Sequence, residues 1–467
     1  MSALRRSGWG RAALIAGAFA AVGLALVAAV QPVHPVGDMA QYRAIALNLV
    51  RGHGYAQTPG EPTAQRVPLY PLFQAAIYAA LGPSAQPLRA AQVLIAAATL
   101  LLVYGLGATL GGRRAGAWAA AAAALYPATM FYAQALLSET LFTFFVIGAA
   151  WCAVSGRRPV GAGALIGLAA LTRPIGLMLG PALAAAAWWP RRWRTTRNWK
   201  QPTLLLAGML LALSPWVMRN EIALGRPLVA DLTGGKNLLI GCNPYAGARE
   251  QGRRLFAAAP RQARDGLSLS KAAASPLAGI TGEVALDTAA RRAALTYLGA
   301  HPGRIALLAP FRLAAFWGLD REPLYLYREG YFGRRPWLRW PLAVAGLGLA
   351  PLLGLALVGA AGADPSTGSG SPLRSRTGAS RAQPRGDPRA APLWAAMAAL
   401  WLPHALLFAE PRFHFPLTPL LAVFAGLALA RREVRAVRRV YVWAAACALA
   451  AIWIGDIVTS FSRFAAI

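Results

Sequence analysis

The sequence contains little cysteine, lysine or acid, and each shortage narrows the class of protein. Three cysteines occur in 467 residues, at the widely separated positions Cys152, Cys242 and Cys447. Neither a disulfide framework nor a thiolate metal site is expected from an odd number at such spacing. Only 17 residues are acidic, and lysine occurs just three times, at Lys200, Lys236 and Lys271. Arginine therefore supplies nearly all of the positive charge.

The charge balance is strongly positive. In a soluble protein, a formal net charge of +30 would suggest a nucleic-acid partner. Here the arginines gather in short segments between apolar runs, which is the pattern of cytoplasmic loops in membrane proteins. We therefore expect no nucleic-acid partner and use the arginines to orient the chain.

Long apolar runs dominate the sequence. Hydrophobic residues make up 57% of the chain and charged residues 14%, with a mean hydropathy of +0.44. Runs of about 17–25 apolar residues, long enough to cross a bilayer, recur along the chain. The first run, residues 12–30, follows three arginines as a signal peptide would, but its length and the many later runs favour a retained anchor. The sequence predicts an all-α polytopic membrane protein.

Arginine placement orients the predicted spans. The basic segments 113–114, 157–158 and 190–200 are assigned to the cytoplasm. This gives about eleven spans, near residues 12–30, 88–110, 115–134, 138–154, 159–173, 174–189, 202–218, 338–360, 392–408, 413–430 and 440–458. Residues 159–189 form a tight hairpin with its outer corner at Thr172-Arg173-Pro174. Residues 68–82, bounded by prolines, are predicted to be an interfacial helix on the outer side.

The chain divides into three predicted parts. Residues 1–218 form a transmembrane catalytic module with a first outer loop at 31–87. Residues 219–337 form a mixed periplasmic or extracellular domain with an interfacial helix. Residues 338–460 form the last transmembrane helices, interrupted at 363–392 by a low-complexity cytoplasmic linker that buries too little apolar surface to fold.

The apolar stretch 304–318 decides the orientation of the last spans. If it crosses the membrane, the loop 431–439, with its five arginines, lies outside. If it lies in the outer interface, that loop falls inside, as the charge rule favours. We adopt the interfacial placement.

With this topology, several ionisable residues converge on the outer membrane boundary: Asp38, Arg66, Glu139, Arg173, Arg219, Arg412 and His414. Ionisable groups at a membrane edge are costly unless they bind or react with something. The planar arginine fork suits phosphate oxygens. We therefore expect an outward-facing pocket for a phosphate-linked substrate, with Arg66, Arg173, Arg219 and Arg412 on the donor phosphate.

The reaction that this set suggests is glycosyl transfer. Breaking a sugar–phosphate bond leaves negative charge on the departing phosphate, which arginines or a divalent ion would stabilise. A carboxylate beside the acceptor would remove its proton, and Asp38 is the candidate base. Glu139 would orient the acceptor or, with Asp38, hold a metal ion, since carboxylates suit hard cations. No cofactor is required by the pattern, and a divalent metal ion is left open.

Each of these residues also has a plain structural explanation. Asp38 could be a solvated loop residue, and Glu139 could be a helix N-terminal acid favoured by the helix dipole. The arginines could extend to lipid headgroups. His414 is given no proton-transfer role. The glycine pairs in Gly52-His53-Gly54 and Gly234-Gly235 lack the strand–helix context of a nucleotide loop and are interpreted as turns.

Eight segments in order carry a family resemblance: GDMAQY, RVPLYP, LYPATMFYAQALLSETLF, LTRP, SPWVMRN, GGKNLLIGCNPYAG, YLGAHPGRI and RFHFPLTPLLAVFAG. This series resembles bacterial GT-C glycosyltransferases. More narrowly, it is similar to the family 39-like group that includes protein mannosyltransferases and the lipid A aminoarabinose transferase. The similarity extends to about residue 430 and spares the linker.

The resemblance implies a GT-C-like bundle, a polyprenyl-phosphate sugar donor, an inverting mechanism and a site on the periplasmic or extracellular face. It implies that Asp38 is the catalytic carboxylate, Glu139 the second acid, and Arg66 and Arg412 the family's arginines. Further substrate contacts are expected from residues in the matching segments: Tyr42, Tyr70, Lys236, Asn237, Asn243 and His414.

The sequence departs from the family pattern in two places, and each departure narrows the expected site or acceptor. Met39 follows Asp38 where many members carry a second acid, so a two-carboxylate arrangement within this loop is not expected. The additional lumenal domains of protein mannosyltransferases are not evident, which favours a lipid or cell-envelope glycan as the acceptor.

The sequence thus predicts an inverting hexosyl- or pentosyl-type glycosyltransferase of the bacterial inner membrane, in contact with membrane lipids, a polyprenyl-phosphate sugar and a lipid or glycan acceptor. A transporter or flippase of a lipid-linked substrate is the main alternative, although transporters place ionisable groups near the membrane midplane. A glycan polymerase or ligase shares the donor class. A non-catalytic scaffold would have no need of Asp38.

Overall fold

The structure is a computed structural model that describes residues 8–31, 33–156, 158–188, 199–244, 246, 277, 279–333, 335–347, 349, 352–357, 388–430 and 454. Most of the predicted linker 363–392, most of the basic segment 190–200, the loop 431–439 and nearly all of the predicted span 440–458 lie outside these residues. Their predicted roles stay predictions.

The described part of the chain is helical throughout. The first half contains α2 (Trp9–Ala29), α3 (Asp38–Val50), α4 (Leu69–Leu81), α5 (Ala85–Leu125), α6 (Pro127–Gln134), α7 (Glu139–Ser155), α8 (Pro159–Thr172), η1 (Pro174–Met178), α9 (Leu179–Trp188) and α10 (Lys200–Leu224). The second half contains α11 (Gly234–Gly241), α13 (Glu283–Ala300), α14 (Pro302–Ala315), α15 (Glu322–Arg328), η4 (Pro336–Leu338), α16 (Arg339–Leu347), η5 (Pro388–Ala390), α18 (Ala391–Trp401), η6 (Leu402–Ala405), η7 (Pro411–Leu417) and α19 (Thr418–Ala430).

The predicted all-α class is confirmed. The described residues contain no strand, and their one extended pairing is an isolated bridge between Ala56 and Pro62. Four helical segments in this part of the chain are long and apolar enough to cross a membrane: Trp9–Ala29, Ala85–Leu125, Lys200–Leu224 and Pro411–Ala430. The total of about eleven spans stays a prediction.

Helix α5 is two antiparallel legs joined at a glycine. Gly112 has φ 80° and ψ 174°, which breaks the helix where only glycine is free of strain. The legs then pack against each other, since a Cβ on Gly116 would lie 2.5 Å from the carbonyl oxygen of Tyr104. In a straight helix these residues would be about 18 Å apart. The hairpin places the predicted spans 88–110 and 115–134 side by side.

Small residues also set the spacing between α8 and α10. A Cβ on Gly163 of α8 would lie 1.9 Å from the carbonyl oxygen of Leu205 in α10. From the other side, a Cβ on Gly208 would lie 2.3 Å from the carbonyl oxygen of Val160. Close backbone approach through glycine is the usual way in which membrane helices associate, because lipid gives them no hydrophobic driving force.

The basic ends of several helices meet at one end of the bundle. A Cβ on Gly8, which precedes α2, would lie 3.1 Å from Cβ of Arg113 at the α5 turn. Gln201 at the start of α10 donates to the carbonyl oxygen of Gly156, which follows α7. Arg389 donates to the carbonyl oxygen of Thr109 in α5. The predicted cytoplasmic turns therefore share one side of the fold.

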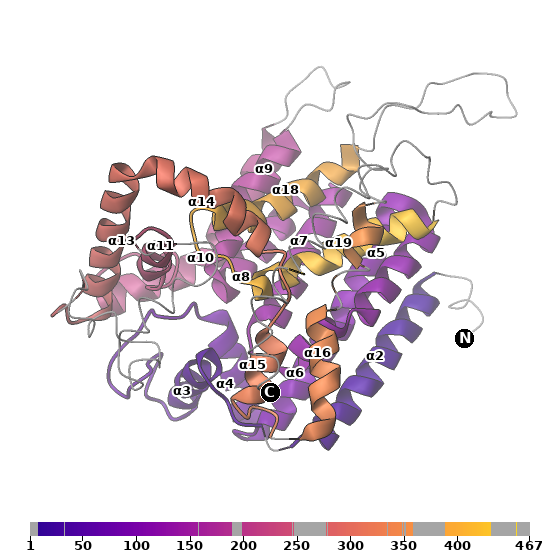
Figure 1. Cartoon of the computed structure of the whole chain (residues 1–467), viewed down its shortest axis with the longest axis horizontal. Coiled ribbons are helices and arrows are strands. Elements are labelled where there is room, and N and C mark those ends of the chain that lie inside the picture. The colour runs from indigo at the N-terminus through magenta and orange to yellow at the C-terminus, as the bar shows by residue number, and fades with distance from the viewer. Residues whose placement is uncertain are drawn as a thin grey trace, which may run out of the picture.

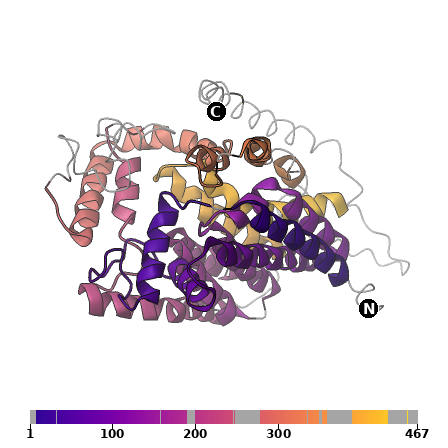
Figure 2. The ribbon, with the colours of Figure 1, turned by 90° about the horizontal axis from the view of Figure 1, so that it is seen from below.

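Three ionisable residues singled out from the sequence lie at the opposite ends of these helices. Asp38 follows α2, Glu139 begins α7, and Arg173 follows α8. In Figure 1, the α5 turn and the start of α2 are at the right, α3 and α4 are at the lower left, and α11 and α13 are at the left. Seen from below, α13 and α11 are again at the left and the start of α2 is at the right (Figure 2).

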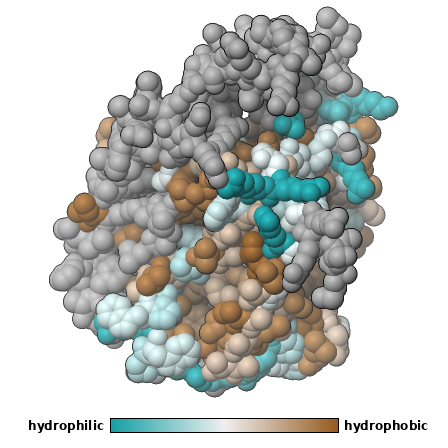
Figure 3. Space-filling view, turned by 90° about the vertical axis from the view of Figure 1, so that its right-hand side faces the viewer, coloured by the Kyte–Doolittle hydropathy of each residue, from teal (hydrophilic) through white to brown (hydrophobic). Residues whose placement is uncertain are grey.

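The outer surface of α2 is apolar. Leu14, Val22 and Leu24 are exposed on it, as is Trp118 of α5. Figure 3 shows the face at the right of Figure 1, where apolar residues cover much of the surface not drawn in grey and hydrophilic residues form a smaller group. Exposed apolar surface of this kind suits contact with lipid.

Two local features differ from or add to the sequence analysis. Gly234 and Gly235 are not a turn but the first residues of α11, so that interpretation was wrong. The Gly235 amide donates to Asp287 at 2.6 Å, and glycine is needed for this close approach because a Cβ would lie 2.2 Å from the Asp287 carbonyl oxygen.

In the first outer loop, residues 38–50 form helix α3, which the sequence analysis treated as loop. Gly52 and Gly54 do form a turn, with φ of 79° and 75°.

The α8–α10 contact yields a stability prediction. Gly163→Ala should lower the free energy of unfolding by about 1–3 kcal/mol, because the new methyl group overpacks the interface. Gly17→Ala on α2 is the matched control, since a Cβ there meets nothing within 4 Å. It should leave stability unchanged or raise it slightly, because alanine favours helix. Thermal unfolding in detergent measures both, and equal effects of the two substitutions would contradict the close packing.

Candidate active site

Asp38 lies at the first position of α3, and arginines face both of its carboxylate oxygens. Oδ1 is 2.5 Å from Nη2 of Arg66. Oδ2 is 3.5 Å from Nη2 of Arg412. The side chain of Asp38 is 32% exposed, so it is open to a substrate as well as to its two partners.

The two arginines keep Asp38 ionised. Burial raises the pKa of its carboxyl group, but Arg66 and Arg412 outweigh burial and lower the pKa to about 2. Asp38 is therefore a carboxylate at neutral pH. As long as both arginines face it, it is also a weak base.

Arg66 is fixed by three groups of α3. Its Nε and Nη2 donate to Oε1 of Gln41 at 2.9 and 2.8 Å, and its guanidinium lies 5.2 Å from the ring centre of Tyr42. The Asp38 carboxylate raises the pKa of Arg66 despite burial, so Arg66 stays charged. This arginine joins the loop before α4 to the start of α3.

Arg412 lies in η7 and faces three carboxylates at once. Besides Asp38, it is 3.5 Å from Oε1 of Glu322 and 3.2 Å from Oε2 of Glu410. Its guanidinium also lies 5.3 Å from the ring centre of Phe413. These distances are long for ion pairs, so Arg412 is shared among its partners rather than held by one.

Glu139 and Arg173 form a second ion pair, with 2.6 Å between Oε1 and Nη1. Glu139 begins α7 and is only 2% exposed, and its Oε2 has no hydrogen-bond partner among the described residues. Arg173 lies in extended backbone between α8 and η1, with φ −148° and ψ 128°. Nη1 of Arg173 also donates to Oγ of Ser138 at 3.2 Å.

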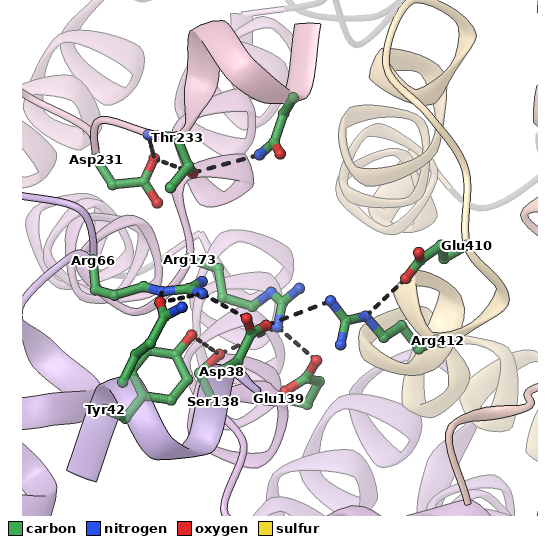
Figure 4. A network of polar contacts seen from close by, with 12 residues as sticks. Asp38, Tyr42, Arg66, Ser138, Glu139, Arg173, Asp231, Thr233, Glu410 and Arg412 are labelled. Atoms are coloured by element: carbon green, nitrogen blue, oxygen red, sulfur yellow. Dashed lines mark hydrogen bonds and ion pairs between the residues drawn. The ribbon is translucent and has the colours of Figure 1, made fainter. Parts of the chain in front are cut away.

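The two ion pairs belong to one network. The Tyr42 hydroxyl is 3.5 Å from Oγ of Ser138, which links α3 to the start of α7. In Figure 4, Asp38, Arg173 and Arg412 point toward one another from separate segments of the chain. Charged side chains that the sequence spreads over the whole chain thus meet at one place.

Sequence reasoning missed Glu322 and Glu410, which face Arg412, and the buried Asp320, which accepts from the Glu322 amide. Burial raises the pKa of Glu322 to about 8, against the opposing effect of Arg412. Asp320 is buried, and its pKa is raised to about 6. Their signal was weak, because each is a single acid next to an apolar stretch. The fold brings Glu322 and Glu410 to Arg412.

The charges of the network balance only if one acid is protonated. Its arginines are Arg66, Arg173 and Arg412, and the carboxyl groups paired with them are Asp38, Glu139, Glu322 and Glu410. A neutral Glu322 removes the excess negative charge. The raised pKa of Glu322 therefore agrees with the charge count.

Arg219 lies apart from this network. It donates to the carbonyl oxygens of Thr63 and Tyr55 at 2.8 and 3.0 Å, and its guanidinium lies 5.2 Å from the ring centres of Tyr55 and Trp216. Its observed contacts hold the first outer loop against α10. The predicted contact with the donor phosphate stays untested.

Three other residues that were predicted to contact substrate are buried. Tyr70 is buried, and its hydroxyl donates to Gln92 at 2.6 Å. Asn243 donates to backbone oxygens of α11, and Nδ1 of His414 is 3.0 Å from the carbonyl oxygen of Phe316. In these positions, all three side chains hold the fold together.

Lys236 and Asn237 lie on α11, close to the arginine network. Burial lowers the pKa of Lys236, whereas Glu283 and Asp287 raise it. Nδ2 of Asn237 is 3.5 Å from Oγ1 of Thr233, which itself donates to Asp231 at 2.8 Å. These residues remain candidates for substrate contact.

The predicted divalent metal ion stays a prediction. Across the part of the chain that the structure describes, no three His, Cys, Asp or Glu residues form a group that could hold one. The two predicted ligands, Asp38 and Glu139, each face a guanidinium.

Comparison with known proteins gives one family match. Residues 62–218 match the model of a family described as dolichyl-phosphate-mannose-protein mannosyltransferase. The matched segment contains Arg66, Glu139 and Arg173. No curated protein matches the chain.

Solved structures with weak likeness include two glycosyltransferases. The Archaeoglobus fulgidus oligosaccharyltransferase in the apo form has a TM-score of 0.42 and 14% identity, covering 94% of this chain and 54% of its own. ArnT from Cupriavidus metallidurans, bound to undecaprenyl phosphate, has a TM-score of 0.39 and 17% identity, covering 95% of this chain and 78% of its own. The chain thus spans about half the length of the archaeal enzyme.

The family match agrees with the resemblance predicted from the motifs. Of the ordered segments, those from RVPLYP to the start of SPWVMRN lie within residues 62–218, whereas Asp38 and Arg412 lie outside it. The resemblance to GT-C membrane glycosyltransferases is therefore confirmed for the segment that carries Arg66, Glu139 and Arg173.

Proposed function

We propose that this protein is an inverting membrane glycosyltransferase that moves a sugar from a polyprenyl-phosphate carrier to a lipid or glycan of the cell envelope. The observation that carries the proposal is the ionised Asp38 between Arg66 and Arg412. An anionic base flanked by two guanidiniums supplies both needs of the reaction, a proton acceptor and a site for the leaving phosphate.

The orientation follows from the arrangement of the helix ends. The basic turns lie together at one end of the bundle, and Asp38, Glu139 and Arg173 follow or begin helices at the opposite end. By the positive-inside rule, the basic end faces the cytoplasm. The active site then faces the periplasm or exterior of a bacterial inner membrane.

The donor phosphate would bind by exchange of partners. Arg412 is held at 3.2–3.5 Å by three carboxylates, and a phosphate offers shorter, bidentate hydrogen bonds. As Arg412 turns toward the phosphate, Asp38 loses one of the two cations that lower its pKa. Donor binding would thus make Asp38 a stronger base at the moment when it is needed.

The transfer step keeps charge close to balance. The acceptor oxygen attacks the anomeric carbon from the face opposite the phosphate, and its proton passes to Asp38. The bond between the anomeric carbon and the phosphate oxygen breaks, and its electron pair stays on the phosphate beside the guanidiniums. Attack from the opposite face inverts the anomeric configuration.

Glu139 suits the acceptor rather than the donor. Its Oε1 is held by Arg173, while Oε2 has no hydrogen-bond partner among the described residues. A buried carboxylate oxygen in this state is a strong acceptor for a hydroxyl. Glu139 would orient the acceptor group toward the anomeric carbon.

The carrier class has support from the family description, which names dolichyl-phosphate-mannose, a sugar linked to a lipid through phosphate. As part of the same proposal, the transferred sugar is a hexose or a pentose. The broad apolar surface on α2 would let a lipid tail approach from the membrane.

The role of Asp38 is tested by substitution. Asp38→Asn should lower the transfer rate by about 10²–10⁴-fold, the usual contribution of a general base. Purified protein would be incubated with a panel of labelled polyprenyl-phosphate sugars and an envelope lipid extract. Glu61→Gln, at an exposed acid of the same loop, is the control and should keep full activity. Unchanged turnover by Asp38→Asn would overturn the base assignment.

Arg66 is expected to matter more for donor binding than for turnover. Arg66→Gln should raise the KM for the donor by about tenfold or more, because a charge-assisted hydrogen bond to phosphate is lost. The matched control is Arg226→Gln, at an exposed arginine after α10, which should leave KM unchanged. A normal donor KM with a lower kcat would show that Arg66 serves only to position Asp38.

Glu322 should make stability depend on pH. Because its pKa is raised to about 8 from 4.5, the folded state holds a proton that the unfolded state releases, so stability falls as pH rises between these values. The Tm of the wild type should decline from pH 5 to pH 8, and that of Glu322→Gln should decline less. Differential scanning fluorimetry in one detergent measures both, and parallel curves would show that Glu322 is not the titrating group.

A further inference from the structure

A cavity of about 380 Å³ lies on the side of α3 away from Asp38. One stripe of the helix forms its floor, with Ala40, Ala44 and Leu47 spaced one turn apart. The prolines at positions 35 and 59 contribute to its walls. The cavity is therefore apolar at its base, and it lies beside the active-site helix without being part of the site described above.

The polar groups of the cavity are cationic or neutral. They come from Arg43, Asn48, Arg51 and Gln57, and none of the described residues that line the cavity is acidic. Arg43 and Arg51 lie on the same face of α3, about 12 Å apart along its axis, and both are exposed. The rim thus carries two positive charges with no carboxylate among the lining groups to neutralise them.

These arginines differ from those of the active site in having no ion-pair partner. Arg66, Arg173 and Arg412 each face a carboxylate. Within the described residues, Arg43 and Arg51 form no ion pair, and the one polar side-chain contact of Arg43 is with the Tyr78 hydroxyl on α4. Uncompensated guanidiniums beside a cavity attract an anion.

Gln57 also lines the cavity. Its Nε2 is buried and has no hydrogen-bond partner among the described residues. The position of Gln57 is fixed, because Nδ2 of Asn48 donates to the carbonyl oxygens of Ala56 and Gln57 at 2.8 and 2.9 Å. Because this nitrogen has almost no accessible surface, Gln57 lines the cavity with its other atoms.

We propose that this cavity binds a phosphate-bearing lipid headgroup, with Arg43 and Arg51 on the phosphate. Guanidiniums bind phosphate oxygens with bidentate geometry, and the apolar floor accommodates the glycerol or sugar part of such a headgroup. A free phosphate ion shares this chemistry but leaves the apolar floor unused.

The placement of the cavity at headgroup depth rests on the orientation given under the proposed function, since α3 begins a few residues after α2 ends. The binding itself does not depend on Asp38. In the proposed reaction, a headgroup at this site would anchor an acceptor lipid on one side of α3 while the donor occupies the other side.

The test uses full-length protein in a non-ionic detergent. Three probes are titrated and binding is followed by microscale thermophoresis: dihexanoyl phosphatidic acid, inorganic phosphate and uncharged dihexanoylglycerol. The variant is Arg43→Gln with Arg51→Gln. The control is Arg226→Gln with Arg292→Gln, which removes the same charge at two exposed positions outside the cavity.

Phosphatidic acid should bind the wild type and the control alike and the cavity variant about tenfold or more weakly. Dihexanoylglycerol should not bind at this site. If inorganic phosphate binds as tightly as phosphatidic acid, and with the same loss in the variant, the ligand is a free phosphate rather than a headgroup. Equal affinity of phosphatidic acid for all three proteins would overturn the proposal.

A single substitution guards against misfolding of the double variant. Arg51→Gln alone removes one of the two exposed charges, and it should also weaken phosphatidic acid binding. Donor turnover is measured on the same samples. Absence of turnover in the wild type would count against the glycosyltransferase proposal alone. Equal phosphatidic acid binding by Arg51→Gln and the wild type would count against the cavity alone.

Discussion

The carboxylate of Asp38, held between Arg66 and Arg412, is the interaction on which the rest of the site depends. A carboxylate two-thirds removed from water must be compensated by cations, and here they come from the loop before α4 and from η7 near the end of the described chain. The same ion pairs therefore join distant parts of the bundle and form the centre of the proposed active site. In the proposed reaction, Arg66 and Arg412 keep Asp38 ionised until donor binding draws Arg412 away.

The two proposed anion-binding sites differ in whether carboxylates neutralise their arginines. In the central network, every guanidinium faces a carboxylate, so a phosphate can enter only by displacing one of them. On the other side of α3, Arg43 and Arg51 have no such partners and are open to an anion at once. One helix thus separates a site where binding is coupled to the chemistry of Asp38 from a site where it is not.

Small residues explain how a chain with so few polar contacts between helices forms a defined bundle. Gly107 and Gly116 let the legs of α5 touch, and Gly163 and Gly208 do the same for α8 and α10. The glycine at position 112 was visible in the sequence beside Arg113, and a turn there was predicted from the charge alone. That Gly163 faces Leu205 was not predictable, because pairing of distant helices leaves no local pattern.

The sequence by itself determined the helical class, the turn between the legs of α5, and the residue types able to hold a phosphate-linked substrate, because hydropathy, arginine placement and side-chain chemistry are local properties. Only the tertiary structure decided that Arg412 and Arg173 join Asp38 and Glu139 while the observed contacts of Arg219 hold the first outer loop, and that Glu322 belongs beside Arg412. The reason is physical: ion pairing depends on distances of a few ångströms between residues far apart in the chain, and those distances are set by helix packing.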